Sequence, residues 1–298
     1  MFEVKLISLY FYICEKYEQK LKYQCERFSN NDQPEFTDQE VLTIYLFVTS
    51  QEKRSKIKEV HHFANSYLYS WFPKLPSYQA FNARLNRLVN VLEQLSIELM
   101  EQHLPPNCSE TLSLLDSMPI ITCSGKRQGK VARDITAKGY CSTKGIYYYG
   151  LKLHALGWRR KGELPWPESI VLTSAAENDL TVFKENWSKL YNRIFYGDKI
   201  YNNSDWFKNL LEQYNSEMLT PVKGIKGMPQ CIKQWDKAAN DLYSTAVSRI
   251  RQPIESFFNW LIEKTDIQRA SKIRSTQGLL VHVFGKLAAT FLFVIFNP

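Results

Sequence analysis

Along the first hundred residues, apolar side chains recur every three or four positions, the spacing of amphipathic helices. Prolines are sparse there and lie between the periodic stretches. Thr37 and Glu40, three residues apart, form a capping-box pattern that marks the start of one helix. Residues 1–105 are therefore predicted to form short helices joined by tight turns.

The pattern changes after the segment LPPNCSE, residues 104–110. Apolar side chains then form continuous or alternating runs, which predict strands at residues 111–121, 145–157, 168–175, 193–201 and 217–223. Helical patterns follow the third and fourth strands and close the chain. This order of elements predicts a mixed α/β sheet covered by helices over residues 106–298.

The segment RIRQPIESFFNWL places a charged pair at the margin of an apolar helical stripe. The stripe consists of Val247, Ile250, Ile254, Phe257, Phe258 and Leu261. Arg251 and Glu255 lie together at its edge, one helical turn apart. As a surface ion pair they would contribute only about 0.2–0.5 kcal/mol. Pro253 lacks an amide proton, so the helix is expected to start or kink just before Glu255.

Two aspartates occupy predicted strands. Asp116 lies inside the apolar run SLLDSMP, where a carboxylate is costly unless it is paired or binds a metal. Asp198 follows another apolar strand. With Glu255 they can converge at one sheet edge, and an all-oxygen ligand set suits Mg²⁺ or Mn²⁺. The structural alternatives are a turn cap before Pro119 for Asp116 and pairing with Lys199 for Asp198.

Four segments together resemble the DDE transposases of bacterial insertion sequences: LLDSMPI, YYYGLKLHALG, FYGDKIY and RIRQPIESFFNWLIEK. The resemblance covers essentially all of residues 106–298. It implies a ribonuclease-H-like catalytic domain without a large insertion, preceded by the family's usual helical region. The family's glutamate helix often shows a tyrosine, an arginine and a lysine. Arg251 holds the arginine place, whereas Ser248 and Ile262 stand at the other two, and Lys264 follows shortly after.

The resemblance also implies an activity. The enzyme would cleave phosphodiester bonds at the element ends and join the freed 3′-hydroxyls to target DNA, using two Mg²⁺ or Mn²⁺ ions. Asp116 would bridge the ions, and Asp198 and Glu255 would be outer ligands. Two ends must meet, which implies a homo-oligomer on double-stranded DNA. The expected location is the bacterial cytoplasm, at the nucleoid.

The net positive charge of the protein lies in the second part of the chain. The net charge is 12 − 13 = −1 for residues 1–105 and 26 − 17 = +9 for residues 106–298. A basic surface of this kind favours DNA phosphates as the partner, although a solvated basic hairpin has the same pattern. The candidate DNA-binding side chains are Lys126, Arg127, Arg133, Lys152, Lys199, Arg251 and Lys264, with Arg84 and Arg87 expected on exposed faces of a helix-turn-helix-like unit. A plain helical bundle is the alternative for that unit.

Several other features limit the alternatives. The six scattered cysteines contain no CxxC pair, which fits a reducing cytosol and gives no zinc site. The apolar segment LAATFLFVIF is too short to span a bilayer, so a buried terminal helix and no membrane are expected. Asp179 is interpreted as a helix cap and His154 as a structural strand residue.

Two other functions share much of this pattern. A ribonuclease-H-like nuclease that never joins strands would need the same three acids. A transposase-derived DNA-binding protein without activity would be expected to lack one of them, and all three are present.

Overall fold

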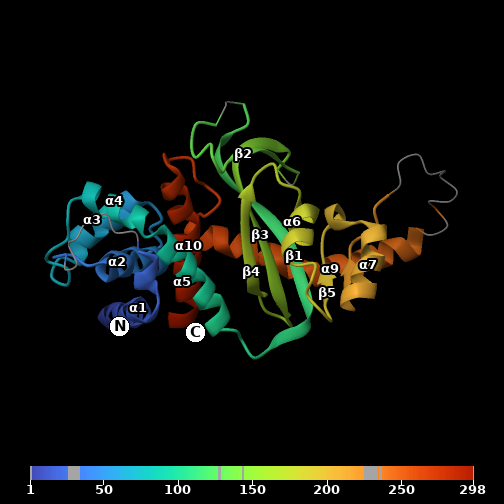
Figure 1. The fold of residues 1–298 in the computed structure, drawn as a ribbon, viewed down its shortest axis with the longest axis horizontal. Coiled ribbons are helices and arrows are strands. Elements are labelled where there is room, and N and C mark those ends of the chain that lie inside the picture. The colour runs from blue at the N-terminus through green and yellow to red at the C-terminus, as the bar shows by residue number, and fades with distance from the viewer. Residues whose placement is uncertain are drawn as a thin grey trace. The chain divides into compact units, whose positions relative to one another are not determined.

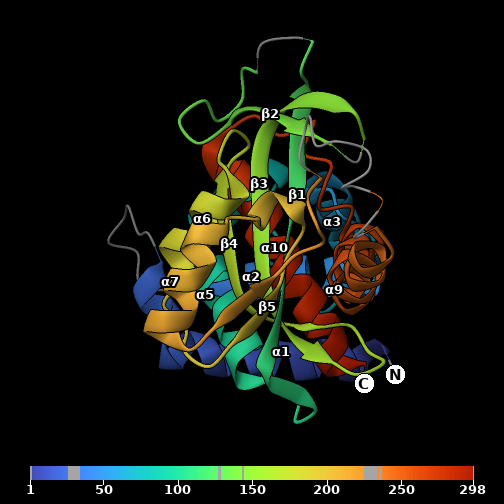
Figure 2. The same ribbon diagram turned by 90° about the vertical axis from the view of Figure 1, so that its right-hand side faces the viewer.

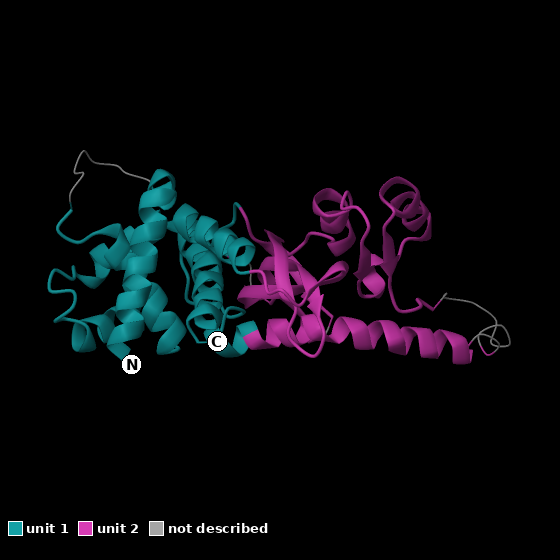
Figure 3. Ribbon diagram, turned by 90° about the horizontal axis from the view of Figure 1, so that it is seen from below, with its two compact units in different colours: residues 1–103, 130–134, 261–298 teal, residues 104–129, 135–260 magenta. Residues whose placement is uncertain are grey.

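The computed structural model describes residues 2–25, 34–126, 129–142, 144–224, 234 and 237–297. The chain divides into two compact units (Figure 3). Unit 1 comprises Met1–His103, Lys130–Asp134 and Leu261–Pro298, and unit 2 comprises Leu104–Gly129 and Ile135–Trp260. Within the range 106–298 predicted as one domain, residues 130–134 and 261–298 group with unit 1 and the rest with unit 2.

Unit 1 is helical, as predicted (Figure 1). It contains α1 (Phe2–Gln19), η1 (Leu21–Gln24), α2 (Asp38–Gln51), α3 (Ile57–Tyr67), α4 (Tyr78–Arg87), α5 (Val89–Gln102) and α10 (Thr276–Phe296). The capping box that starts α2 is confirmed: the Glu40 amide donates to Thr37 Oγ1 at 3.3 Å, and the Glu40 carboxylate accepts from the Thr37 amide.

Helix α10 explains why the end of the chain belongs to unit 1. Its apolar surface packs against α2 and α5. Among the described helices it is the one long and apolar enough to cross a membrane, by length and composition only, and 67% of that apolar stretch is buried inside the protein. Lys286, within α10, donates to the Asp266 carbonyl oxygen at 3.1 Å. The predicted buried terminal helix is confirmed.

Unit 2 is built on a mixed six-stranded sheet, which confirms the predicted α/β class. Its strands are β1 (Cys108–Ser124), β2 (Ala137–Cys141), β3 (Ile146–Arg160), β4 (Trp166–Ser174), β5 (Ile194–Tyr196) and β6 (Glu217–Leu219). The order is β2-β3-β1-β5-β6, with β4 also paired to β3. β3 is antiparallel to β1, β2 and β4, whereas β5 is parallel to β1 and β6.

Strand β2 was not predicted from the sequence. It has five residues and includes Gly139, whose hydrogen faces the Ala175 carbonyl so closely that a Cβ would lie 2.3 Å from the oxygen. Its strand conformation depends on pairing with β3, from Ala137–Gly150 to Cys141–Ile146. A short glycine-containing strand has too little local preference to be recognised alone.

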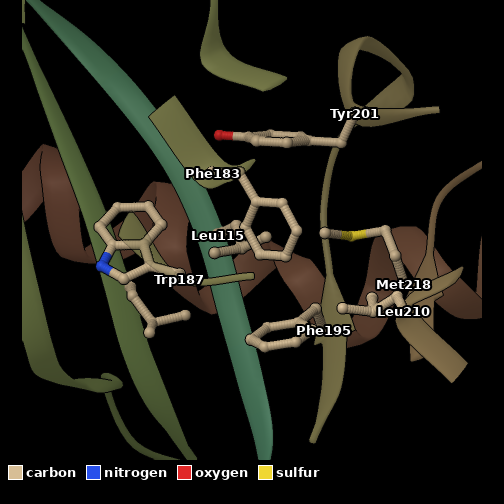
Figure 4. Close-up of a cluster of buried hydrophobic side chains, with 8 residues drawn as sticks. Leu115, Phe183, Trp187, Phe195, Tyr201, Leu210 and Met218 are labelled. Carbon is tan, nitrogen blue, oxygen red and sulfur yellow. The ribbon is translucent and has the colours of Figure 1, made fainter. Parts of the chain in front are cut away.

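Helices cover both faces of the sheet in unit 2 (Figure 2). Helices α6 (Asp179–Asn186) and α7 (Ser204–Tyr214) lie on one face, and α9 (Lys237–Thr265) on the other. The face below α6 and α7 holds a cluster of buried apolar side chains: Leu115, Leu156, Phe183, Trp187, Phe195, Tyr201, Leu210 and Met218 (Figure 4). Because strand side chains alternate between faces, Asp116 points away from this cluster.

Helix α9 buries the predicted apolar stripe. Val247, Ile254, Phe257 and Phe258 are at most 5% exposed. The helix continues through Pro253, so the expectation of a helix start just before Glu255 is wrong. The Arg249 carbonyl loses its helical donor at that point, and Arg249 lies on the exposed side, where water can replace the donor.

Candidate active site

Asp116 occupies the middle of the central strand β1. Its neighbours on the strand, Leu114 and Leu115, are fully buried, and its own side chain is 23% exposed. The Ser117 amide donates to Asp116 Oδ1 at 2.8 Å. Burial raises the pKa of Asp116 to about 6, although Arg251 and the Ser117 amide act in the opposite direction. This carboxyl group is destabilised in its charged form and gains from a nearby cation.

The parallel pairing of β1 and β5 brings the second aspartate level with the first. The paired residues Leu112–Ile194 and Leu114–Tyr196 differ by 82 positions, and so do Asp116 and Asp198 (198 − 116 = 82). Asp198 follows β5 after Gly197 and is exposed. Its negative charge contributes to the raised pKa of Asp116. If the register continues past the end of β5, Asp198 lies level with Asp116.

The third acid reaches the site from α9 through an arginine. Arg251 donates from Nη1 to Asp116 Oδ2 at 2.9 Å and from Nη2 to the Glu255 carboxylate. The Arg251 side chain is 12% exposed, whereas that of Glu255 is 48% exposed. Asp116 and Glu255 are thus bound by one guanidinium, which joins β1 to α9, and the charge of Asp198 is near enough to raise the pKa of Arg251.

The site has more negative than positive charge. Burial lowers the pKa of Arg251, but Asp116, Glu255 and Asp198 outweigh that effect and raise it overall. The guanidinium therefore remains charged; it contacts two carboxylates and is influenced by the charge of a third. Its Nε atom is buried and has no hydrogen-bond partner in the structure. This imbalance suits a site that accepts additional positive charge.

The residues fit a divalent metal by their chemistry. The donor set is three carboxylates, the ligand type that Mg²⁺ and Mn²⁺ prefer. The cation now between two of them is Arg251, which occupies one oxygen of Asp116 and one of Glu255. Within the described ranges, no three His, Cys, Asp or Glu side chains are close enough to hold a metal as they stand. Joint binding of one ion by the three acids would therefore require them to come closer together than they are in this structure.

Residues 107–273 match the family model described as a transposase DDE domain. The match covers more than half of the 298-residue chain. The chain belongs to this family. No curated protein and no solved structure matches it. Family membership agrees with the mixed sheet and with the three acids, and it indicates an enzyme of the transposase and nuclease class.

Two of the basic residues expected at the surface of this DDE transposase have internal partners instead. Arg84 donates from Nε to Asp38 at 2.7 Å and also bonds the Phe36 carbonyl, so the expectation that it is exposed is wrong. Lys152 lies 3.2 Å from an Asp179 oxygen and donates to the Glu177 carbonyl at 2.7 Å. The surface position of both side chains was predicted from the local sequence pattern, which does not reveal acids that are distant in sequence.

The remaining basic candidates differ in their surroundings. Lys126, Lys199, Arg133 and Arg87 are exposed, and Arg127 lies outside the described residues. Lys264 is partly buried, with its ammonium 5.0 Å from the centroid of the Phe293 ring. Lys126 and Lys199 belong to unit 2, as does Arg251.

The interpretation of Asp179 as a helix cap is wrong. The cap of α6 is Asn178, which accepts from the Leu180 amide at 2.9 Å. Asp179 is 7% exposed and lies beside Lys152 and His154 of β3. In the sequence, Lys152 and His154 lie on one face of an apolar strand that contains no acid. This pattern indicates that another element supplies their acidic partner.

Proposed function

We propose that this transposase cleaves phosphodiester bonds at the ends of its mobile element and joins the resulting 3′-hydroxyls to target DNA. Asp116, Asp198 and Glu255 would hold two Mg²⁺ or Mn²⁺ ions. The observation that best supports this is the β1–β5 register, which puts Asp198 level with Asp116 while Arg251 of α9 connects Asp116 to Glu255.

The bound ions would supply an activated attacking oxygen and charge stabilisation for the departing one. The protein residues have separate tasks. Asp116, on the central strand, fixes the position of the site, because it pairs with Ala155 of β3 and the preceding residues of β1 pair with β5. Asp198 and Glu255 are exposed and face the solvent from which DNA approaches. Arg251 keeps the carboxylates together and can turn to a DNA phosphate once positive ions replace it.

The proposed DNA surface of unit 2 consists of Lys126, Lys199 and Arg251, together with Lys138 and Tyr147 of the β2–β3 edge. Lys138 lies 5.1 Å from the centroid of the 60%-exposed Tyr147 ring. Contacts of this kind bind phosphate without reading sequence, so affinity should fall steeply as salt rises. An affinity that is unchanged between low and high salt would contradict this surface.

We also propose that the helical region of residues 1–105 binds element ends, and that two or more copies assemble on DNA. Joining both ends of an element to one target requires two active sites in one assembly. This part rests on the family and on the short helices α3 and α4.

The decisive experiment is a reaction with Mg²⁺ or Mn²⁺ on DNA that contains the sequences flanking the gene. Wild type is compared with Asp116→Ala, Asp198→Ala and Glu255→Ala, and Glu212→Ala on α7 is the control for loss of an exposed acid. We expect nicking and joined product in wild type and control, and neither in the three variants.

The result also separates the alternatives. Nicking without joined product under all conditions would identify a nuclease. Binding without nicking, unchanged in the three variants, would identify a DNA-binding protein and leave Arg251 and Glu255 as a structural pair.

A further inference from the structure

A second group of ionisable side chains lies inside unit 2, beneath the face covered by α6. Asp179 Oδ1 is 3.2 Å from Lys152 Nζ and 3.2 Å from His154 Nδ1. His154 is fully buried, and the side chains of Asp179 and Lys152 are 10% and 14% exposed. Burial lowers the pKa of His154 to about 4, so the imidazole is neutral at physiological pH. No role in the proposed chemistry explains this group.

The hydrogen bonds of the group are incomplete. His154 Nε2 lies 2.9 Å from the Thr173 hydroxyl oxygen, and that hydroxyl oxygen lies 3.2 Å from the Ser174 carbonyl oxygen. His154 Nδ1 and Asp179 Oδ1 are buried, and neither has a well-aligned hydrogen bond in the structure. A buried polar network with incomplete hydrogen bonds is a weak source of stability.

The group is connected to the second aspartate of the active site through Tyr201. Asp179 is the first residue of α6, and Phe183, one turn later, packs edge-on against Tyr201 with ring centroids 6.3 Å apart (Figure 4). Tyr201 is 1% exposed and ends the one-turn helix η2 (Lys199–Tyr201). Its amide donates to the Asp198 carbonyl at 3.0 Å.

The packing around this turn leaves little freedom. A Cβ at Gly197 would lie 2.8 Å from the Tyr201 ring, so the backbone before Asp198 is in direct contact with that ring. The Tyr201 hydroxyl is buried without a hydrogen-bond partner. Burial, and then the charges of Asp179 and Asp116, raise its pKa well above the usual value, so it stays protonated between the two acidic groups.

We propose that Lys152, His154 and Asp179 form a buried positioning network that, through Tyr201, fixes the turn bearing Asp198 at the active site. The inference rests on the proposed function, because it gives Asp198 a metal to hold. Lys152 and His154 are then positioning residues on β3 and not DNA contacts. Ordering of a ligand by residues behind it commonly changes metal affinity by about 10–100-fold.

The test uses the full chain without DNA and has two readouts. Mn²⁺ binding is measured by electron paramagnetic resonance, and hydrogen exchange of residues 198–202 is measured by mass spectrometry without metal. The variants are Asp179→Asn, Lys152→Gln and Asp198→Ala. Leu210→Val is the matched control, because Leu210 is a buried residue of the same apolar cluster as Tyr201 and is not one of the three network residues.

We expect Asp179→Asn to weaken Mn²⁺ binding about 10-fold and to speed exchange at residues 198–202. Lys152→Gln removes the ammonium beside Asp179 but keeps a side chain that can donate to the Glu177 carbonyl, so it should remain folded and weaken Mn²⁺ binding severalfold. Leu210→Val should lower the melting temperature without changing either readout. If Asp179→Asn does not fold, Lys152→Gln decides the question.

The two proposals fail in different ways. If Asp198→Ala weakens Mn²⁺ binding but folded Asp179→Asn or Lys152→Gln binds as wild type does, the positioning network is overturned and the active site stands. If Asp198→Ala binds Mn²⁺ as wild type does, the proposed metal site itself is wrong.

Discussion

Two arginines of unit 2 bind acids of the sheet in contrasting ways. Arg193, just before β5, donates to both oxygens of Glu168 at 2.8 and 3.2 Å and to the Ser113 hydroxyl at 2.9 Å. Its guanidinium carbon lies 3.6 Å from the centroid of the Trp158 ring. Arg251, in contrast, contacts two carboxylates, Asp116 and Glu255, is influenced by the charge of Asp198, and has a buried Nε without a hydrogen-bond partner.

The contrast separates structural from functional charge within one sheet. Arg193 and Glu168 are balanced, one charge against one, and their geometry is a bidentate pair stacked on an aromatic ring. Around Arg251 the acids are in excess, and two of them are exposed. β1 contributes to both places, with Ser113 at the first and Asp116 at the second. An ion pair whose charges balance stabilises the fold, whereas a group with excess negative charge can bind a cation.

The largest expected effect is on activity. Asp116→Asn keeps the shape of the side chain but removes its charge, so metal-dependent cleavage should fall by at least about 1,000-fold. Stability should not fall, because burial and the nearby acids disfavour the charged form. Cleavage assays and thermal unfolding measure the two effects. The matched control is Asp205→Asn at the exposed start of α7. An equal loss of activity in this variant would show that the loss is not specific to Asp116.

The next effect is on stability. Glu168→Gln leaves the Arg193 guanidinium buried without its counter-charge, which should cost about 3 kcal/mol of unfolding free energy. Urea unfolding followed by tryptophan fluorescence is suitable, since Trp158 lies against Arg193. Glu163→Gln, which breaks the more exposed pair with Arg160, should cost under about 1 kcal/mol. Equal losses of unfolding free energy in the two variants would show that the Arg193–Glu168 pair contributes no more than the more exposed pair.

A smaller effect depends on pH. The pKa of Asp116 is raised in the folded state from 3.8 to about 6, so the folded protein binds a proton more tightly than the unfolded chain. That contribution to stability is complete below pH 3.8 and is lost as pH rises through about 6. Without metal, wild type should therefore lose on the order of 1–3 kcal/mol relative to Asp116→Asn between these pH values. Parallel unfolding curves for the two proteins would refute the assignment.

The smallest effect concerns the competition between arginine and metal. In Arg251→Gln the guanidinium no longer holds Asp116 and Glu255, so Mn²⁺ should bind the DNA-free protein about 10-fold more tightly, or about 1.4 kcal/mol. The control is Arg249→Gln, an exposed arginine on the same helix. Titration calorimetry measures both. Weaker binding in Arg251→Gln would mean that the arginine orients the carboxylates more than it competes for them.

Some of these features follow from local sequence. The apolar run around Asp116 predicts a buried strand acid whatever the rest of the chain does, because burying a lone carboxylate is costly. The stripe from Val247 to Phe258 predicts the buried face of α9 in the same way. In both cases the relevant physical effect acts between residues close in sequence.

Other features have no local signal. Asp179 follows a residue that caps the helix, and its partners Lys152 and His154 are 27 and 25 positions away (179 − 152 and 179 − 154). Arg84 is bonded to Asp38, 46 residues earlier. A local sequence pattern can indicate that a charged side chain is exposed. It cannot show that another element of the fold brings an acid next to that side chain.

The sequence by itself determined the class of the two parts, the strand position of Asp116, the position of Asp198 just after a short strand, and the helical face that bears Glu255, because periodicity and the cost of burying charge act locally. Only the tertiary structure decided that Arg251 joins Asp116 to Glu255, that Lys152 and Arg84 face inward, and that residues 261–298 pack with the N-terminal helices. Those outcomes depend on register and on packing between distant segments, which no short stretch of the chain specifies.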